Sequence, residues 1–339
     1  MLALYIFLLL NFFLISASIL VYAERKVSAY IHNRPGPNRV GPLGLLQPFA
    51  DVIKLVFKEE ITPVVANPFI HSLAPVIMVM IAMTTTALIP FSNGMVVADL
   101  NVGALALLGL TSIAVYGVTL AGWSSNSKYS LLGGLRSSAQ MISYELSMGL
   151  AVVSVILMTG SLRIMDIVEA QNFAWNFLIN PIGCIIFIIT AFAETNRAPF
   201  DLPEAEQELV GGYHTEYSGM KFGMFFLAEY VNLFIASFFI STFFFGGYLL
   251  PFQDTIIGWF PGLADSLALT VLQMLSLVVK AAFFAIVFIW VRWTLPRFKY
   301  SQLMVVGWKY LLPIAVVWVT IVALWLATGA PFLQSIIGW

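Results

Sequence analysis

Long, almost uncharged apolar stretches run through the chain and leave few folds open to it. A helix needs about 20 apolar residues to cross the hydrocarbon core of a bilayer, and eight stretches come close to or exceed that length. They are continuously apolar and do not alternate, which argues against the strands of a membrane barrel. We therefore predict an all-α polytopic membrane protein, a single transmembrane domain over residues 1–339. Its eight transmembrane helices are expected at roughly residues 2–22, 69–91, 102–123, 139–162, 173–193, 223–249, 267–291 and 310–328.

The composition excludes a soluble globular protein. Of the 339 residues, 60% are apolar and only 10% are charged, whereas an ordinary soluble domain needs about a quarter charged residues to cover its surface. Sixteen Lys and Arg nearly balance seventeen Asp and Glu, so the net charge gives no sign of a nucleic-acid partner. The single cysteine, Cys184, excludes an iron–sulfur cluster, a thiolate zinc site and an internal disulfide.

The first apolar stretch is predicted to be retained as a helix. It ends in Val21-Tyr22-Ala23, which imitates the small-residue cleavage site of a signal peptide. However, residues 1–22 contain no Lys or Arg, and the first cations, Arg25 and Lys26, follow the stretch. A cleaved signal peptide would have the reverse charge order.

Positive charge is concentrated on one side of the expected bundle. Fourteen of the sixteen Lys and Arg fall in or beside the loops after spans one, three, five and seven. Loops rich in these residues stay on the cytoplasmic side. Both termini are therefore predicted to be periplasmic, and the two long loops are predicted to face the cytoplasm. Arg163 lies on the opposite side, and Lys280 lies within a span.

The first long loop, residues 23–68, changes character along its length. Residues 34–42 contain several Pro and Gly, which prevent both helix and sheet. Over about residues 47–58, apolar residues recur at helical spacing, with Asp51 among the charged residues on the opposite stripe. This predicts a short amphipathic helix. It either rests in the interfacial plane of the bilayer or forms one wall of a chamber that opens at the membrane surface.

The second long loop, residues 194–222, is strongly acidic and has Arg197 as the cation among its acids. Carboxylates this close together cannot all ionise without screening, so some are expected to hold exchangeable protons near neutral pH. A solvated acidic loop, or a docking face for a basic partner, are the alternative interpretations. The acids are Glu194, Asp201, Glu204, Glu206, Glu208 and Glu216.

Three ionisable residues interrupt the apolar stretches. Glu145 lies in the fourth stretch, Glu229 lies early in the sixth beside Tyr230, and Lys280 lies in the seventh. A charge at the centre of a bilayer costs about 2.5–3.5 kcal/mol on insertion scales. Each alone could form a structural ion pair between helices. Together with the acidic loop, they favour a hydrated path for protons.

Motifs for nucleotides, metals and haem are absent from the sequence. No glycine-rich dinucleotide fingerprint and no phosphate-binding loop occur. His32, His71 and His214 are scattered without the spacing of a zinc site, and His214 is at most a candidate for handling protons. We therefore predict that the chain binds no metal and no cofactor. Electron transfer would need partner subunits or a substrate dissolved in the membrane.

Several segments resemble one family, the H subunit of bacterial NADH–quinone oxidoreductase (respiratory complex I), whose mitochondrial counterpart is NADH dehydrogenase subunit 1. The resemblance covers nearly the whole chain. It is carried by Glu24-Arg25-Lys26, the run 34–58, Ala193-Glu194-Thr195-Asn196-Arg197-Ala198-Pro199-Phe200-Asp201-Leu202, Glu216-Tyr217, Ala228-Glu229-Tyr230 and Leu295-Pro296-Arg297-Phe298-Lys299-Tyr300.

The resemblance implies a membrane subunit that forms much of a quinone-binding chamber and couples quinone reduction to proton translocation through buried carboxylates. Quinone, such as ubiquinone, would be the substrate. FMN and iron–sulfur clusters would belong to partner subunits of the peripheral arm, and other partners would be membrane-arm subunits and lipid. By similarity, the quinone-binding residues are Glu24, Arg25, Asp51, Arg197 and Arg292. The coupling path by similarity includes Glu145, Glu194, Glu204, Glu206, Glu208, Glu216, Glu229 and Tyr230, and the charge pattern adds Asp201 and Lys280.

Two other functions remain open. A related membrane hydrogenase component would share the bundle and the acids but use no quinone. A self-sufficient secondary ion transporter would usually show internal repeats and broken helices, and no convincing repeat is found. We expect a bacterial plasma membrane, because no transit-like leader precedes the first stretch, with a mitochondrial inner membrane as the alternative.

Overall fold

The structure is a computed structural model that describes residues 2–201, 211–251, 253, 258 and 266–328. Regular structure in this part of the chain is helical, apart from one isolated β-bridge between Ser92 and Met95. Seven of its helices are long and apolar enough to cross a membrane. They are α1 (Leu2–Ile31), α3 (Pro68–Thr85) with η2 (Thr86–Leu88), α4 (Gly103–Ser124), α5 (Lys128–Thr159), α10 (Gly219–Phe244), α12 (Leu267–Thr294), and α13, η5 and α14 together (Tyr300–Val305, Val306–Leu311 and Leu312–Ala327).

The stretch at 173–193, predicted as one span, is interrupted. Its last part forms α8 (Pro181–Glu194), which follows α6 (Ile164–Glu169) and the single turn α7 (Asn176–Ile179). The break occurs at Asn180, whose side chain accepts from the backbone N–H of Gly183, with Pro181 at the first helical position. Proline has no N–H to donate and its ring starts a helix readily. The 14 residues of α8 extend about 21 Å, less than the thickness of the hydrocarbon core.

Two helices extend well beyond their apolar stretches. The first helix continues to Ile31 and so carries Glu24 and Arg25, while α5 begins at Lys128 and ends where Gly160 takes a left-handed φ of 67°. The apolar stretch therefore marks the part that lipid can surround, whereas the helix itself continues as long as its backbone hydrogen bonds do.

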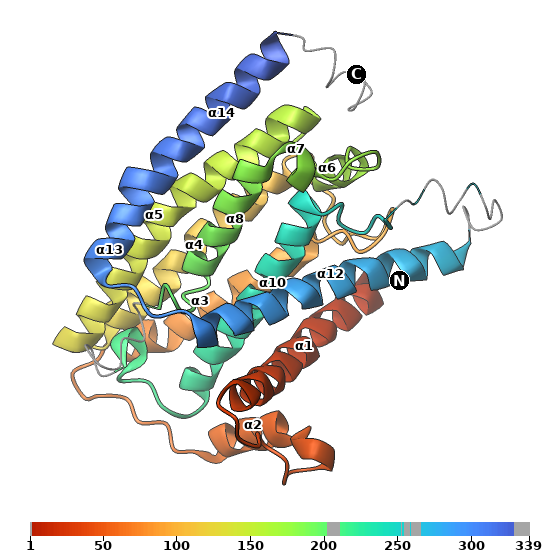
Figure 1. Ribbon diagram of the computed structural model, residues 1–339. Helices are drawn as coiled ribbons and strands as arrows, with labels where there is room; N and C mark the ends of the chain where they lie inside the picture. The colour runs from red at the N-terminus through yellow and green to blue at the C-terminus, as the bar shows by residue number, and fades with distance from the viewer. Residues whose placement is uncertain (1, 202–210, 252, 254–257, 259–265, 329–339) are drawn as a thin grey trace.

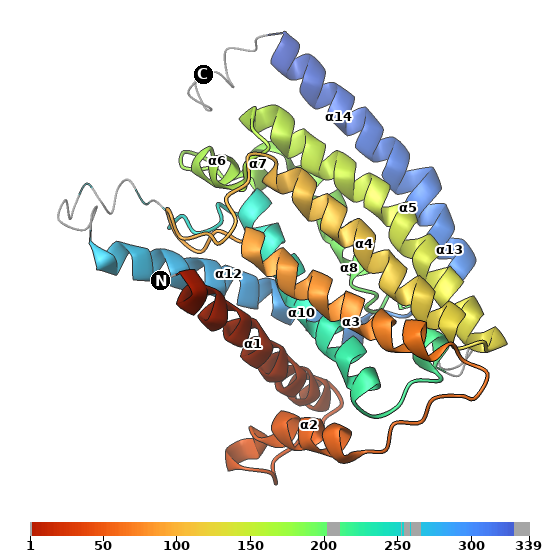
Figure 2. The ribbon, with the colours of Figure 1, turned by 180° about the vertical axis from the view of Figure 1, so that it is seen from behind.

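The helices pack around α10. It contacts α1, α3 and α12, while α5 packs against α4, α8 and α14 (Figures 1 and 2). The first helix joins α10 through aromatic contacts, with the rings of Phe12 and Phe13 close to those of Phe234 and Phe238. The helices α4 and α5 approach closely at glycines: a Cβ on Gly122 would lie 2.7 Å from a backbone oxygen of α5.

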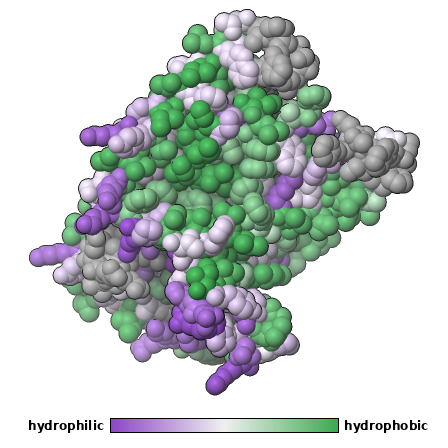
Figure 3. Space-filling model, in the orientation of Figure 1, coloured by the Kyte–Doolittle hydropathy of each residue, from purple (hydrophilic) through white to green (hydrophobic). Residues whose placement is uncertain are grey.

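A short helix lies across one end of the bundle. It is α2 (Gln47–Phe57), which crosses the end of α1 (Figure 2). Its apolar side chains Phe49, Val52, Ile53 and Val56 are exposed. Hydrophilic side chains gather toward this end of the molecule, and the remaining surface in this view is mainly apolar (Figure 3). The chain enters α1 and leaves α14 at the other end (Figure 1).

Candidate functional site

A buried cluster of charges lies where α1, α10 and α12 meet the turn after α8. Arg197, in that turn, is only 1% exposed. Its Nε lies 2.8 Å from Oε1 of Glu229, and its Nη1 lies 3.4 Å from Oε2 of Glu24. Arg292 binds the other oxygen of Glu24. The ring of Tyr230 lies beside the Arg197 guanidinium, with 4.3 Å between the ring centre and Cζ.

The balance of charge explains why this cluster can be buried. Isolated charges in a low-dielectric interior are very costly, so buried ions are paired and hydrogen-bonded. Here two arginines face two carboxylates, and Arg197 is shared between Glu24 and Glu229. Removing any one member would leave an unbalanced charge. The four come from separate parts of the chain, so the cluster also joins three helices and the turn.

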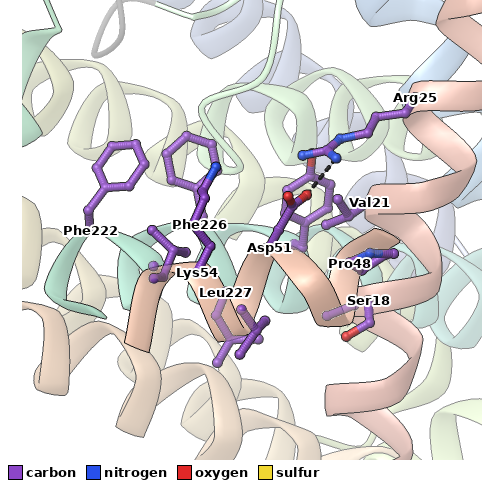
Figure 4. Close-up of a pocket in the computed structure, with 14 residues that line it drawn as sticks. Ser18, Val21, Arg25, Pro48, Asp51, Lys54, Phe222, Phe226 and Leu227 are labelled. Carbon is purple, nitrogen blue, oxygen red and sulfur yellow. Dashed lines mark hydrogen bonds and ion pairs between the residues drawn. The ribbon is translucent and has the colours of Figure 1, made fainter. Parts of the chain in front are cut away.

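A cavity of about 300 Å³ lies beside the cluster, between α1, α2 and α10 (Figure 4). Phe222, Phe226 and Leu227 of α10 give it an apolar wall. On the side of α1 and α2, Arg25 and Asp51 form an ion pair of 2.5 Å. This volume is at the lower end of the range for small-molecule sites.

Tyr230 connects the cavity to the buried charges. It lines the cavity and its ring packs against Arg197. A change of charge in the cavity would therefore act across one aromatic ring on the Arg197 ion pairs. The arrangement suits a ligand with a polar head and an apolar tail, because the cavity offers both kinds of wall.

Two smaller cavities continue inward from Glu229. The first, about 20 Å³, is lined by Glu229, Asn232 and Glu194, and the second, about 50 Å³, is lined by Asn232, Glu194 and Thr111. A water molecule needs about 10–15 Å³ of such volume. The first cavity therefore has room for about one water and the second for a few.

Glu145 lies close to the end of this series of cavities. Its carboxylate on α5 accepts a hydrogen bond from Ser112 on α4. It is near enough to Glu194 for the two charges to repel one another. The structure thus brings Glu24, Arg197 and Glu229 together. A cavity with room for water joins Glu229 to Glu194, and Glu145 lies near Glu194 without lining either small cavity.

Other residues predicted for the path lie apart from this series. Asp201 forms an ion pair with Arg297 at 3.6 Å, and Glu216 lies next to His71 at the start of α3. The ammonium group of Lys280 donates to two backbone carbonyls in the loop after α10, at 2.9 and 2.7 Å. The remaining three predicted acids, Glu204, Glu206 and Glu208, lie outside the described residues.

One polar residue at the site, Asn232, was not singled out in the sequence. Asn232, which lines both small cavities, follows Glu229 by three residues on the mainly apolar α10, and that spacing places the two on one helix face.

His214 was considered in the sequence as a candidate for handling protons. Burial lowers its pKa to about 4, and its ring contacts Phe222 and Phe226. His214 is therefore neutral at physiological pH, which argues against that role.

Fold and site together define a polytopic membrane protein with ion pairs buried beside an amphipathic cavity. In the part of the chain that the structure describes, no group of three His, Cys, Asp or Glu could hold a metal ion. A family model described as NADH dehydrogenase matches residues 4–323. The chain belongs to this family.

Bacterial relatives match over nearly their full length. The chain is 71% identical over 323 residues to the NADH-quinone oxidoreductase H subunit of Salinibacter ruber, covering 94% of each chain. It is 68% identical over 330 residues to NADH-quinone oxidoreductase subunit 8 of Rhodothermus marinus, covering 96% of this chain and 97% of that one. For the H subunit of Rhodospirillum centenum the identity is 50% over 310 residues, covering 91% and 89%.

These matches confirm the resemblance found in the sequence. Together with the seven long apolar helices, they identify a multi-pass protein of the bacterial plasma membrane, as expected.

Proposed function

We propose that this chain is a membrane subunit of proton-translocating NADH:quinone oxidoreductase, in which it forms much of the quinone-binding chamber. The names of its relatives support the enzyme and the substrate. The main observation in support of a quinone-binding chamber is the cavity between α1, α2 and α10, which has the Arg25–Asp51 ion pair on one wall and Tyr230 on another. Other subunits of the complex would hold the FMN and the iron–sulfur clusters that deliver electrons.

The cavity suits the two chemical parts of a quinone. A long isoprenoid tail needs an apolar wall that continues to lipid, which α10 and the exposed apolar face of α2 provide. The head-group carbonyls accept hydrogen bonds, and Arg25 at the cavity wall is a donor that remains charged. Reduction adds negative charge to the head-group and takes up protons.

That change of charge would reach the buried acids through Tyr230 and Arg197. Two unit charges about 5 Å apart interact by roughly 3 kcal/mol at an effective dielectric constant near 20. This is enough to change whether a poised carboxyl holds a proton. A path from Glu229 past Asn232 to Glu194 and Glu145 could then conduct protons through water or transmit the change electrostatically.

The other predicted acids and Lys280 remain parts of the proposal. Arg292 would steady Glu24 at the inner end of the chamber. The loop acids Asp201 and Glu216, with the three acids outside the described residues, would exchange protons with the cytoplasm. Lys280 would sit at the far end of the path, near the loop after α10.

We also propose eight membrane crossings, with α8 as a short one enclosed by the bundle, and both termini in the periplasm. Two observations support this orientation. The start of α1 and the end of α14 both lie away from α2 (Figure 1). Fourteen of the sixteen Lys and Arg occur in or beside the loops at the end with α2, which the charge rule assigns to the cytoplasm. With α8 as the eighth crossing the number is even, as two termini on the same side of the membrane require.

Blocking the cavity tests where quinone binds. Val21→Trp should raise the KM for quinone about tenfold, which corresponds to about 1.4 kcal/mol of lost binding, because Val21 lines the cavity. Ile19→Trp is the matched control, since Ile19 is on the same helix but is 57% exposed and outside the cavity lining. Equal KM values in the two variants would contradict a quinone in this cavity. Absence of quinone from the purified complex would favour the hydrogenase alternative.

Arg25→Ala should strongly depress quinone reduction while NADH oxidation with an artificial acceptor continues. The Arg25–Asp51 pair is partly exposed, and pairs of this kind contribute only about 0–1 kcal/mol to stability. A loss of quinone reduction would therefore report on the substrate. Lys26→Ala, at the neighbouring cation, should have little effect. Loss of both activities after Arg25→Ala would instead indicate failed assembly.

A further inference from the structure

Gln140 is a fully buried amide on α5 beside the turn that carries Arg197. Its Nε2 donates to the carbonyl oxygens of Ala193 and Phe200, both at 2.7 Å. A longer contact of 3.4 Å reaches Oδ1 of Asn196. One side chain thus binds the backbone on both sides of Arg197.

The turn needs this support because it has few hydrogen bonds of its own. Within it, Asn196 N–H donates to Ala193 at 3.4 Å and Phe200 N–H donates to Arg197 at 2.9 Å. Buried carbonyl oxygens require donors, and an amide has two hydrogens to give. Both hydrogens of the Gln140 amide are used in the two short bonds. The segment after α12 also binds the turn, through the N–H of Phe298 to the carbonyl of Pro199 at 3.1 Å, but the bonds from Gln140 reach the backbone on both sides of Arg197.

Neighbouring residues of α5 contact the same turn. Ser137 Oγ lies 3.5 Å from Oδ1 of Asn196, and Nδ2 of Asn196 lies 3.6 Å from Sδ of Met141. The Oε1 of Gln140 is buried and has no hydrogen-bond partner among the described residues. The orientation of the Gln140 side chain is therefore set by its amide N–H groups, whose partners are Ala193, Asn196 and Phe200.

We propose that Gln140 is a positioning residue for quinone-coupled turnover: it holds the turn where Arg197 lies between Glu24 and Glu229. This inference rests on the proposed function, in which the Arg197 ion pairs transmit the change of charge. The distances to the two carboxylates are 2.8 and 3.4 Å, so a small shift of the turn would lengthen one pair or both. Misplacing a functional group by about 1 Å can reduce a rate about 100-fold.

A second buried glutamine gives a matched control. Gln171 is also fully buried, and its Nε2 donates to the carbonyls of Ile167 and Thr242 at 3.0 and 2.9 Å. Its Oε1 accepts from the backbone N–H of Gly246 at 2.9 Å. It supports the backbone at the opposite end of α10 from Glu229. Replacing it disturbs packing to a similar degree without touching the Arg197 turn.

The test uses Gln140→Leu, Gln171→Leu and Arg197→Lys in the intact complex, together with the Gln140→Leu/Arg197→Lys double variant. Inhibitor-sensitive quinone reduction is measured relative to NADH oxidation with an artificial acceptor, which corrects for the amount of assembled complex. We expect Gln140→Leu to lower this ratio at least tenfold and Gln171→Leu to leave it unchanged. The double variant should be no slower than Arg197→Lys alone, because both changes remove the same interaction.

Each other outcome has a distinct meaning. If the two glutamine variants behave alike, or if the effects in the double variant multiply, Gln140 does not act through Arg197 and the inference is overturned. If Arg197→Lys is slow while Gln140→Leu is normal, the positioning role alone fails. If Arg197→Lys is normal, the proposed role of the charge cluster fails, and any effect of Gln140→Leu then has another origin.

Discussion

Arg197→Met is expected to abolish quinone reduction and to reduce the amount of assembled complex. Methionine keeps the apolar volume of the side chain but leaves Glu229 without its 2.8 Å partner and Glu24 with Arg292 alone. Arg197 is 1% exposed, so water cannot replace it. Breaking a buried pair in this way costs about 3–5 kcal/mol, which is a large share of the stability of a typical domain.

The measurements are quinone reduction per assembled complex and complex content on native gels. Arg163→Met is the matched control, because Arg163 also faces two carboxylates, Asp99 and Asp166, but is 40% exposed. Exposed pairs contribute little, so this variant should assemble and turn over normally. Equal losses in the two variants would contradict a special role for the buried cluster.

Glu194→Gln is expected to reduce proton translocation and the turnover coupled to it by more than tenfold. Glutamine has the same shape as glutamate and keeps one hydrogen-bonding oxygen, but it cannot take up and release a proton. Glu194 lines both small cavities, between Glu229 on one side and the neighbourhood of Glu145 on the other. Its neutral replacement therefore interrupts the series of acids at its middle.

Proton translocation is measured in sealed vesicles, with NADH oxidation by an artificial acceptor as the reference for electron input. Glu169→Gln, in the short helix α6, is the control for the loss of one negative charge. It should pump normally. Unchanged pumping in Glu194→Gln would remove Glu194 from the path and favour a route that avoids the two small cavities.

The sequence predicts the helices better than it predicts the contacts between them. Seven of the eight apolar stretches form helices long enough to span the bilayer, because burial in lipid depends on local composition. The stretch at 173–193 is not one continuous helix, because Asn180 and Pro181 begin a new helix inside it. Asn followed by Pro is a recognised start signal for a helix. It was overlooked because the residues on both sides are continuously apolar.

The composition of the charge cluster could be predicted in part. The family resemblance grouped Glu24, Arg197 and Arg292, but it assigned Glu229 to a separate path. In the structure Arg197 contacts both carboxylates. The pairs with Glu24 join residues 173 and 268 positions apart in the chain, and such distances depend on how whole helices pack.

The location of Lys280 could not be inferred from charge pattern. A lone cation in an apolar stretch suggests a carboxylate partner. Instead its ammonium group donates to the carbonyls of Gly247 and Leu249 and lies 4.6 Å from the centre of the Trp175 ring. Backbone carbonyls are present in every loop, so no residue type in the sequence marks them as partners.

The glycine contact between α4 and α5 limits how these two helices can move relative to each other. A Cβ on Gly122 would meet the backbone oxygen of Ser130 at 2.7 Å, and one on Gly134 would meet Gly122 at 3.2 Å. Two backbones in direct contact have no side chains between them to rearrange, so we expect α4 and α5 to move together. Glu145 on α5 and Ser112 on α4, which donates a hydrogen bond to it, belong to this pair of helices. We therefore expect motion that opens or closes the route between the carboxyls to come from α8, α10 and the turn that carries Arg197.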